Sequence, residues 1–193
     1  MDRQQQLDAL SAEIVEQSIC PELKAQAIQL VKGAGTPNAD IVFIGEAPGK
    51  KEDEQGVPFI GAAGKILTAS LETIGLTRDD VYITNIVKYR PPKNRDPKPE
   101  EKAAFWPYLE RELEIIQPKL IVALGRHSMG YFLPDAVIGE VHGTPTPVYV
   151  GAHKAILLPI YHPAATIYNQ KLRSDFDEDF RTIPGVASAS GAA

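Results

Sequence analysis

The amino-acid sequence predicts an α/β fold in which helices cover both faces of a parallel sheet. Four short apolar runs, at 39–45, 80–88, 118–125 and 153–163, have the composition of strands that are buried on both faces. Segments with helical spacing lie between these runs, and strands that alternate with helices form parallel sheets. Ligands bind beyond the carboxyl ends of such strands, so the residues after each run are the candidates for function.

The chain begins with helices and then reaches the first strand. Residues 3–18 carry apolar side chains at helical spacing, and Pro21 suits the first position of a second helix. Residues 33–40 have the composition of a loop. The segment 46–64 after the first strand is rich in glycine and longer than an ordinary connection, which indicates a functional loop.

The rest of the chain alternates between helices and strands. The expected order is helix 65–75, strand 80–88, helix 99–116, strand 118–125, strand 153–163 and helix 171–183. Gly75 is a common type of helix end, Pro91 stops the second strand, and Pro99 suits the start of a helix. The small and polar residues 185–193 are expected to form a disordered tail.

Length and composition favour one globular domain, expected over 1–184 with an N-terminal helical segment at 1–32. The chain has 193 residues, of which 44% are apolar and 23% charged. No apolar run approaches the roughly 18–20 residues that cross a bilayer, and the polar N-terminus is unlike a secretory signal. We therefore expect a cytoplasmic protein. Cys20 is the only cysteine, which excludes an internal disulfide and a multi-cysteine metal site.

Positive charge is concentrated in one segment, KYRPPKNR. The formal net charge of −5 argues by itself against a nucleic-acid partner. Between Lys88 and Lys98, however, five cations accompany a single acid, Asp96. We expect this segment to meet a phosphate backbone or to cap nearby carboxylates. The cations concerned are Lys88, Arg90, Lys93 and Arg95.

Two polar side chains stand where strands end. Asn85 offers one acceptor and two donors, which match the N3–H and O4 edge of uracil and not the opposite pattern of cytosine. His162, between Tyr161 and Pro163, can donate from a neutral imidazole to an oxyanion on a leaving group. The structural alternatives are an amide that satisfies loop backbone and a histidine that is hydrogen-bonded in a turn.

The glycine-rich segment adds further candidates. GEAPG at 45–49 holds the backbone open to a ligand, although the dinucleotide fingerprint is absent. Glu46 and Glu52 are candidate carboxylates, and Phe59 offers a face on which a base can stack for about 1–3 kcal/mol. Alternatively, the two glutamates are solvated loop acids and Phe59 belongs to the core. Three other histidines show no metal-like spacing and are interpreted as structural or surface residues, so no metal site is expected: His127, His142 and His153.

Several motifs together resemble one family. GEAPGKKEDEQGVPFIGAAG (45–64), VYITNIVKYRPPKNRDP (81–97), PKLIVALG (118–125) and YHPAA (161–165) are similar in order and spacing to the uracil-DNA glycosylase superfamily, most closely to family 4, the iron–sulphur type. The resemblance implies a three-layer α/β/α sandwich around a four-stranded parallel sheet. It also implies base-excision repair, in which uracil is flipped out and excised from DNA to leave an abasic site and free uracil. We expect a monomer.

The resemblance also implies roles for the site residues. Glu46 matches a carboxylate that is needed for activity and either stabilises an oxocarbenium-like sugar or orients water. Ala47 lines the base site where family 1 has an aspartate, which excludes water activation from that position. His162 matches the histidine at uracil O2.

Three further positions are implied to recognise the base. Glu52 matches an acid near the C5 edge, where the methyl group of thymine must be refused. Phe59 matches the stacking aromatic, and Asn85 matches the amide that reads uracil.

Residues 166–173, TIYNQKLR, match the loop that wedges into the duplex. Ile167 or Tyr168 is expected to fill the vacated space, and Lys171 and Arg173 to hold phosphates. The family commonly has leucines and an arginine in this loop, so the residues here depart from its pattern.

The main departure from family 4 is the cluster, which four cysteines hold. Cys20 lies close to the second position, Gln17 stands where its partner would be, Tyr89 takes the third position, and the fourth falls in AAFW. One thiolate cannot hold such a cluster, so we predict that it is absent. Packing of Tyr89 with Phe105 or Trp106 is expected to replace it, with Cys20 as a small buried hydrophobe.

Three hypotheses follow. The first is an active uracil-DNA glycosylase without the cluster. The second is a glycosylase with a shifted base preference, for example for hypoxanthine, because the wedge and the cluster region depart from the family. The third is a non-catalytic DNA- or nucleotide-binding module on the same fold, against which the presence of Glu46, Asn85 and His162 counts.

Overall fold

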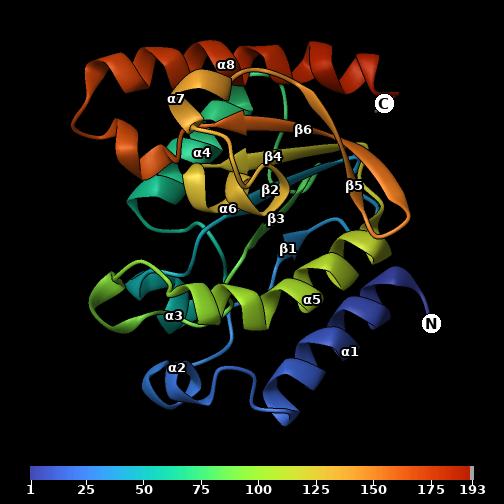
Figure 1. The fold of residues 1–193 in the computed structure, drawn as a ribbon, viewed down its shortest axis with the longest axis vertical. Coiled ribbons are helices and arrows are strands. Elements are labelled where there is room, and N and C mark those ends of the chain that lie inside the picture. Colours follow the sequence, from blue (N-terminus) through green and yellow to red (C-terminus); the bar gives the residue numbers. More distant parts are fainter. Residues whose placement is uncertain (192–193) are drawn as a thin grey trace.

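A computed structural model describes residues 1–191 of the chain, and helices pack on both sides of one sheet (Figure 1). The helices are α1 (Arg3–Glu16), α2 (Pro21–Gln26), α3 (Lys50–Gln55), α4 (Ala62–Thr73), α5 (Pro99–Ile116), α6 (Arg126–Phe132), α7 (Ile138–Val141) and α8 (Gln170–Ala189). The strands are β1 (Ala34–Gly35), β2 (Ile41–Gly45), β3 (Tyr82–Asn85), β4 (Leu120–Leu124), β5 (Thr146–Val150) and β6 (His153–Ile160). Two 3₁₀ turns, η1 (Pro92–Asn94) and η2 (Pro163–Thr166), follow β3 and β6.

The six strands lie in the order β1-β3-β2-β4-β6-β5. The four central strands are those expected from the sequence, and they pair in parallel, which confirms the α/β sandwich. The strand count was incomplete, because β1 and β5 add antiparallel pairs at the two edges. β5 alternates exposed and buried residues and carries Pro147, as an edge strand can, so it lacks the continuous apolar run of the central strands.

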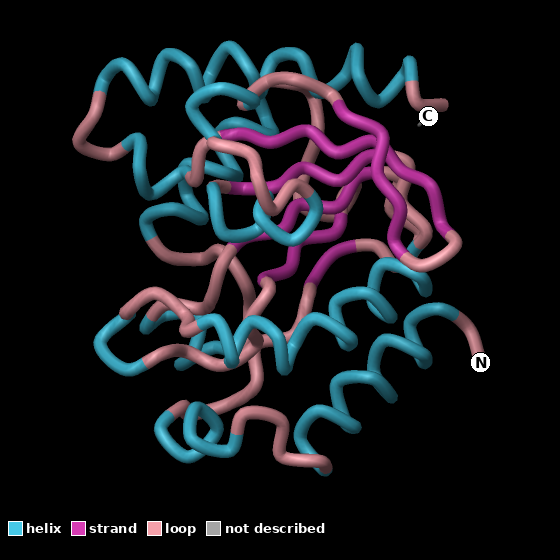
Figure 2. The backbone as a smooth tube through the Cα atoms, in the orientation of Figure 1, coloured by secondary structure: helices cyan, strands magenta, loops and turns pink. Residues whose placement is uncertain are grey.

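Two apolar cores lie on opposite faces of the sheet because side chains alternate along each strand. On β2, Val42 and Ile44 join the core under α1 and α5, whereas Ile41 and Phe43 join the core under α4 and α8. The smooth trace shows the magenta strands between these two helical layers (Figure 2). All five residues of β2 are buried, as its apolar sequence predicts.

The glycine-rich segment is not one long loop, because it contains the helix α3. Gly49 precedes this helix, and Gly56 ends it with a left-handed φ of 72°. The carboxylate of Glu52 accepts a hydrogen bond from the Gly49 N–H at 3.1 Å, which closes the first turn. The two glycines that mark the segment as a loop in the sequence are therefore the ends of a short helix.

The last helix is longer than the sequence predicts. α8 continues through Pro184 to Ala189, so the tail expected over 185–193 is wrong for its first five residues, and residues 192–193 lie outside the described part. Phe176, Phe180 and Ile183 are buried against the sheet, and Ala187 continues the same stripe. This packing outweighs the helix-breaking tendency of the proline.

Among the described helices, none is both long enough and apolar enough to span a membrane. The parallel strands β2, β3, β4 and β6 all end at one edge of the sheet. The segments that the sequence marks as unusual therefore meet at that edge.

Candidate active site

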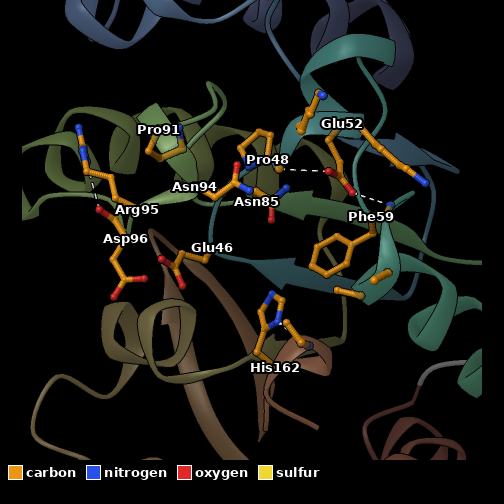
Figure 3. A pocket seen from close by; sticks show the side chains of 18 of the residues that line it. Glu46, Pro48, Glu52, Phe59, Asn85, Pro91, Asn94, Arg95, Asp96 and His162 are labelled. Atoms are coloured by element: carbon orange, nitrogen blue, oxygen red, sulfur yellow. Dashed lines mark hydrogen bonds between the residues drawn. The ribbon is translucent and has the colours of Figure 1, made fainter. Parts of the chain in front are cut away.

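A cavity of about 590 Å³ opens at the carboxyl edge of the sheet (Figure 3). Its walls come from the ends of β2, β3 and β6, from α3 and from the segment after Pro91. It is lined by all six residues that the sequence assigns to catalysis or base binding: Glu46, Ala47, Glu52, Phe59, Asn85 and His162. The site residues that lie far apart in the sequence are thus brought together around one hollow.

Asn85 presents its side chain at the end of β3. Only 3% of the residue is exposed, and its Oδ1 is buried without a hydrogen-bond partner among the described residues. The neighbouring strand makes room for it at Gly45, where a Cβ atom would lie 2.5 Å from Asn85 Oδ1 and even closer to the Phe59 ring. An unpaired buried amide oxygen at a cavity wall is an acceptor that awaits a donor.

His162 follows β6 and faces the same cavity. The N–H of Ala164 donates to its Nδ1 at 3.1 Å, so a neutral ring carries its proton on Nε2. Burial, and to a lesser extent the neighbouring His127, lowers the pKa of His162 to about 4. The imidazole is therefore neutral at physiological pH, with an N–H that is free to act as a donor.

Phe59 is held in a strained backbone conformation, with φ at 54°. Its ring lies 5.7 Å from the ring of His162, with 29° between their planes. On one side Arg78 donates to the carbonyl groups of Phe59 and Pro58, at 2.8 and 2.6 Å. Arg78 was not predicted as a site residue, because nothing in its local sequence marks it.

Glu52 anchors the other side of this segment. Besides the Gly49 N–H, its carboxylate accepts hydrogen bonds from the N–H groups of Ile60 and Gly61, at 3.0 and 2.7 Å. The residue is only 8% exposed. Glu52 therefore fixes the backbone that follows Phe59.

Glu46 lies at the opposite wall, beside Asp96 and His127. The Nε2 atom of His127 is 3.6 Å from Glu46 Oε2 and 3.4 Å from Asp96 Oδ2. Burial, and then the negative charge of Asp96, raises the pKa of Glu46 to about 7. The sequence interpretation of His127 as a structural or surface residue did not include its contact with Glu46, because the two residues lie far apart in the sequence.

One ligand atom from each of Glu46, Asp96 and His127 lies within 4.8 Å of the others. Two cations contact this cluster. Arg126 lies 3.6 Å from Asp96, and Lys102 Nζ donates to His127 Nδ1 at 3.5 Å. Because these positive charges neutralise the acids and disfavour a further cation, the arrangement is explained by ion pairing.

The basic segment serves several purposes, and one prediction is wrong. Lys88 is only 3% exposed and pairs with Glu112, so it cannot reach a DNA backbone. Arg95 forms a two-pronged pair with Glu101, the capping role that the sequence left open. The remaining predicted contacts divide into two kinds: Arg90 and Arg173 bond to Asn94 and Asp177, whereas Lys93 and Lys171 are exposed.

The predicted wedge follows η2 at the rim of the cavity. Tyr168 is 97% exposed and Ile167 is 42% exposed. Ala164 and Ala165, just before them, line the cavity. The predicted wedge residues therefore follow closely after two residues that line the cavity.

Aromatic side chains fill the corner where the resemblance places a cluster. Tyr89 is 1% exposed and meets Phe105 edge-on, with the ring centres 6.1 Å apart, as predicted. Trp106 instead stacks on Tyr131 at 4.6 Å. Cys20 is half-buried, with its Sγ 3.9 Å from the carbonyl oxygen of Glu101.

Comparison with known proteins gives a consistent result. A model of the uracil DNA glycosylase superfamily matches residues 32–183. The chain is 46% identical to a type-4 uracil-DNA glycosylase of Sulfurisphaera tokodaii, over 94% of this chain and 84% of that protein. It is 45% identical to the type-4 enzyme of Archaeoglobus fulgidus, over 92% and 91% of the two chains. The type-4 enzyme of Thermotoga maritima is 39% identical, over 87% and 86%.

Proposed function

Because this chain belongs to the uracil-DNA glycosylase superfamily, we propose that it excises uracil from DNA in base-excision repair. Hydrolysis of the N-glycosidic bond adds water across it and yields an abasic site and free uracil. The observation that carries this proposal is the buried Oδ1 of Asn85 at the cavity wall, which has no hydrogen-bond partner within residues 1–191. It matches the N3–H donor of uracil, and cytosine has no proton at N3.

Residues on different walls of the cavity are assigned to different parts of the substrate. The target base leaves the helix at a cost of a few kcal/mol and stacks on the ring of Phe59. Asn85 accepts from uracil N3–H and donates to O4. The Nε2–H of His162 donates to the O2 oxygen, on which negative charge grows as the base departs.

Glu46 faces the sugar side of the same reaction. As the glycosidic bond breaks, the sugar becomes oxocarbenium-like, and an ionised carboxylate either stabilises that charge or orients the attacking water. Both roles require the deprotonated form of Glu46. Ala47, which follows it and lines the cavity, has no group that can take a proton.

We also propose that the enzyme works without an iron–sulphur cluster. The corner does not fit one: the whole chain has a single cysteine, and the third position is the buried ring of Tyr89. Anaerobically purified protein is expected to lack the broad visible absorption of such clusters and to contain no stoichiometric iron. Visible absorption together with iron and sulphide would contradict this proposal.

The quaternary structure and location follow as further proposals. We propose that the protein is active as a monomer, as expected from the sequence. Light scattering of the active protein tests that state. DNA as the substrate is consistent with the cytoplasmic location expected from the sequence.

Incubation with oligonucleotides tests the function directly. Single- and double-stranded substrates that carry uracil, hypoxanthine or a thymine mismatch are treated with the protein and then cleaved with alkali. Strand breaks at uracil alone are expected. Breaks mainly at hypoxanthine would show a shifted base preference, and an absence of breaks in every substrate would leave only a non-catalytic module.

A further inference from the structure

Lys88 is buried directly behind the base-reading residue. It is 3% exposed, and its Nζ donates to three acceptors: Thr84 Oγ1 at 2.5 Å, the Asn85 carbonyl oxygen at 2.9 Å and Glu112 Oε2 at 2.6 Å. An ammonium group has three donors, so every one of them is used. The side chain is therefore fixed in one position.

Glu112 ties this group to α5. Its carboxylate also accepts from the Tyr82 hydroxyl at 2.9 Å and from the Thr84 hydroxyl at 3.1 and 3.2 Å. The residue is 4% exposed. The network thus joins the buried face of α5 to the last residues of β3.

Stability alone does not account for such a pair. Two buried ions lose their hydration, and well-packed apolar residues of similar volume commonly stabilise a fold as well or better. What distinguishes this pair from an apolar contact is the hydrogen bond from Lys88 to the backbone of Asn85.

The peptide between Asn85 and Ile86 is held at both ends. Its carbonyl oxygen accepts from Lys88 Nζ, and its N–H, on Ile86, donates to the Gly45 carbonyl oxygen at 3.0 Å. With this peptide plane fixed, the backbone from which the Asn85 side chain extends is restrained as well. That restraint matters because Asn85 Oδ1 is buried and unpaired, and rotation of the backbone would relieve this cost.

We propose that Lys88 and Glu112 are positioning residues that hold Asn85 in the orientation that reads uracil. They touch neither base nor sugar and act through the Asn85 backbone alone. The inference rests on the proposed function, since it concerns how the same site selects its base. Lys88 thus supports base selection from a buried position, whereas its charge alone suggests a contact with DNA.

The decisive variant removes both charges together. In Lys88→Met/Glu112→Gln, the amide oxygen at position 112, in the place of Oε1, still accepts from the hydroxyls of Tyr82 and Thr84, and no lone ion is buried. A second variant, Lys88→Met/Glu112→Leu, serves if the first does not fold. Tyr82→Phe is the matched control. It removes a hydrogen bond to the same carboxylate but keeps the hydrogen bond from Lys88 to the Asn85 carbonyl oxygen.

The readout is the preference for free uracil over 3-methyluracil, measured as the ratio of their inhibition constants in the cleavage assay. 3-Methyluracil lacks the N3–H that Asn85 reads. The double variant is expected to lose about tenfold of this preference, roughly the worth of one well-aligned hydrogen bond. Tyr82→Phe is expected to melt earlier and to keep the preference of the wild type.

Two outcomes would overturn the inference while the proposed function stands: a folded, active double variant with an unchanged preference, or an equal loss in Tyr82→Phe. The second would mean that any loosening of α5 has the same effect. A wild-type protein that neither cleaves uracil-containing DNA nor binds uracil would instead refute the proposed function, and this inference with it.

Discussion

The Nε2 atom of His127 lies 3.6 Å from Oε2 of Glu46, and the same nitrogen lies 3.4 Å from Asp96 Oδ2. Lys102 donates to the other ring nitrogen, so a neutral His127 turns an N–H toward both carboxylates. Burial lowers the pKa of His127 and favours that neutral form. The carboxylate of Glu46 therefore has a polar neighbour and a second acid beside it.

This cluster predicts a pH dependence. Burial and the charge of Asp96 raise the pKa of Glu46 to about 7. Because the role proposed for Glu46 requires its ionised form, the rate of uracil release should fall as the pH drops through about 7. His162, with a pKa of about 4, stays neutral over that range and does not contribute. Single-turnover rates between pH 5 and 9 give the pH–rate profile, and the fall on its acidic side is called the acidic limb.

Asp96→Asn removes one cause of the raised pKa of Glu46, so the acidic limb of the pH–rate profile should move to lower pH. Asp135→Asn, at an exposed site, is the control and should leave the limb in place. If the limb of Asp96→Asn matched that of the wild type, Asp96 would not set the protonation state of Glu46.

Tyr168→Ala tests the wedge. A fully exposed aromatic ring at the rim of the cavity can fill the space that a flipped base leaves in a duplex. Cleavage of double-stranded substrate should therefore fall by about tenfold or more, since keeping a base flipped costs a few kcal/mol. Single-stranded substrate, which has no stack to hold open, should be cleaved almost as well as by the wild type. Equal losses on both substrates would contradict the assignment.

Lys93 and Lys171 are the two predicted DNA contacts that remain exposed. Replacement of both by alanine should weaken binding to DNA and reduce the slope of log K against log salt by about 0.9 for each phosphate that is no longer neutralised. Lys119 precedes β4 at the opposite edge of the sheet and pairs with Asp40, so Lys119→Ala is the control. Fluorescence anisotropy over a range of salt concentrations gives both slopes, and identical slopes would exclude the two lysines as contacts.

Replacement of Tyr89 by phenylalanine is expected to stabilise the protein. Its hydroxyl is buried without a partner among the described residues, so Tyr89→Phe should raise the free energy of unfolding by about 1 kcal/mol. Tyr108 offers the opposite case, because its hydroxyl donates to Gln17 at 2.9 Å and Tyr108→Phe should destabilise. Urea unfolding of the two variants separates them. A loss of stability in Tyr89→Phe would mean that the hydroxyl has a partner.

The central fold was predictable because parallel strands that are buried on both faces leave continuous apolar runs, as in Ile41–Gly45. The edge strand Thr146–Val150 left none, because every second residue faces solvent. The end of α8 was missed for another reason. Its packing on the sheet, through Phe180 and Ala187, is a tertiary effect that overrides the local signal of Pro184.

The site divides in the same way. The positions of Asn85 and His162 at the cavity were predictable, because Asn85 ends β3 and His162 lies two residues beyond the end of β6. The burial of Lys88 was not, since its charge suggests exposure and its partner Glu112 belongs to a distant helix. Contacts of this kind, which join residues far apart in the chain, decide whether a cation binds DNA or supports the site.

Asn85 is the residue to which the proposed selection of uracil is assigned, and removal of its side chain is the most direct test. In an assay of uracil release from a single-stranded oligonucleotide, Asn85→Ala should lower kcat by about 10²–10³-fold, as removal of a buried polar group that faces the transition state does. Its circular dichroism and melting temperature should remain close to those of the wild type. Undiminished uracil release by a folded Asn85→Ala protein would contradict the claim that this amide selects the base.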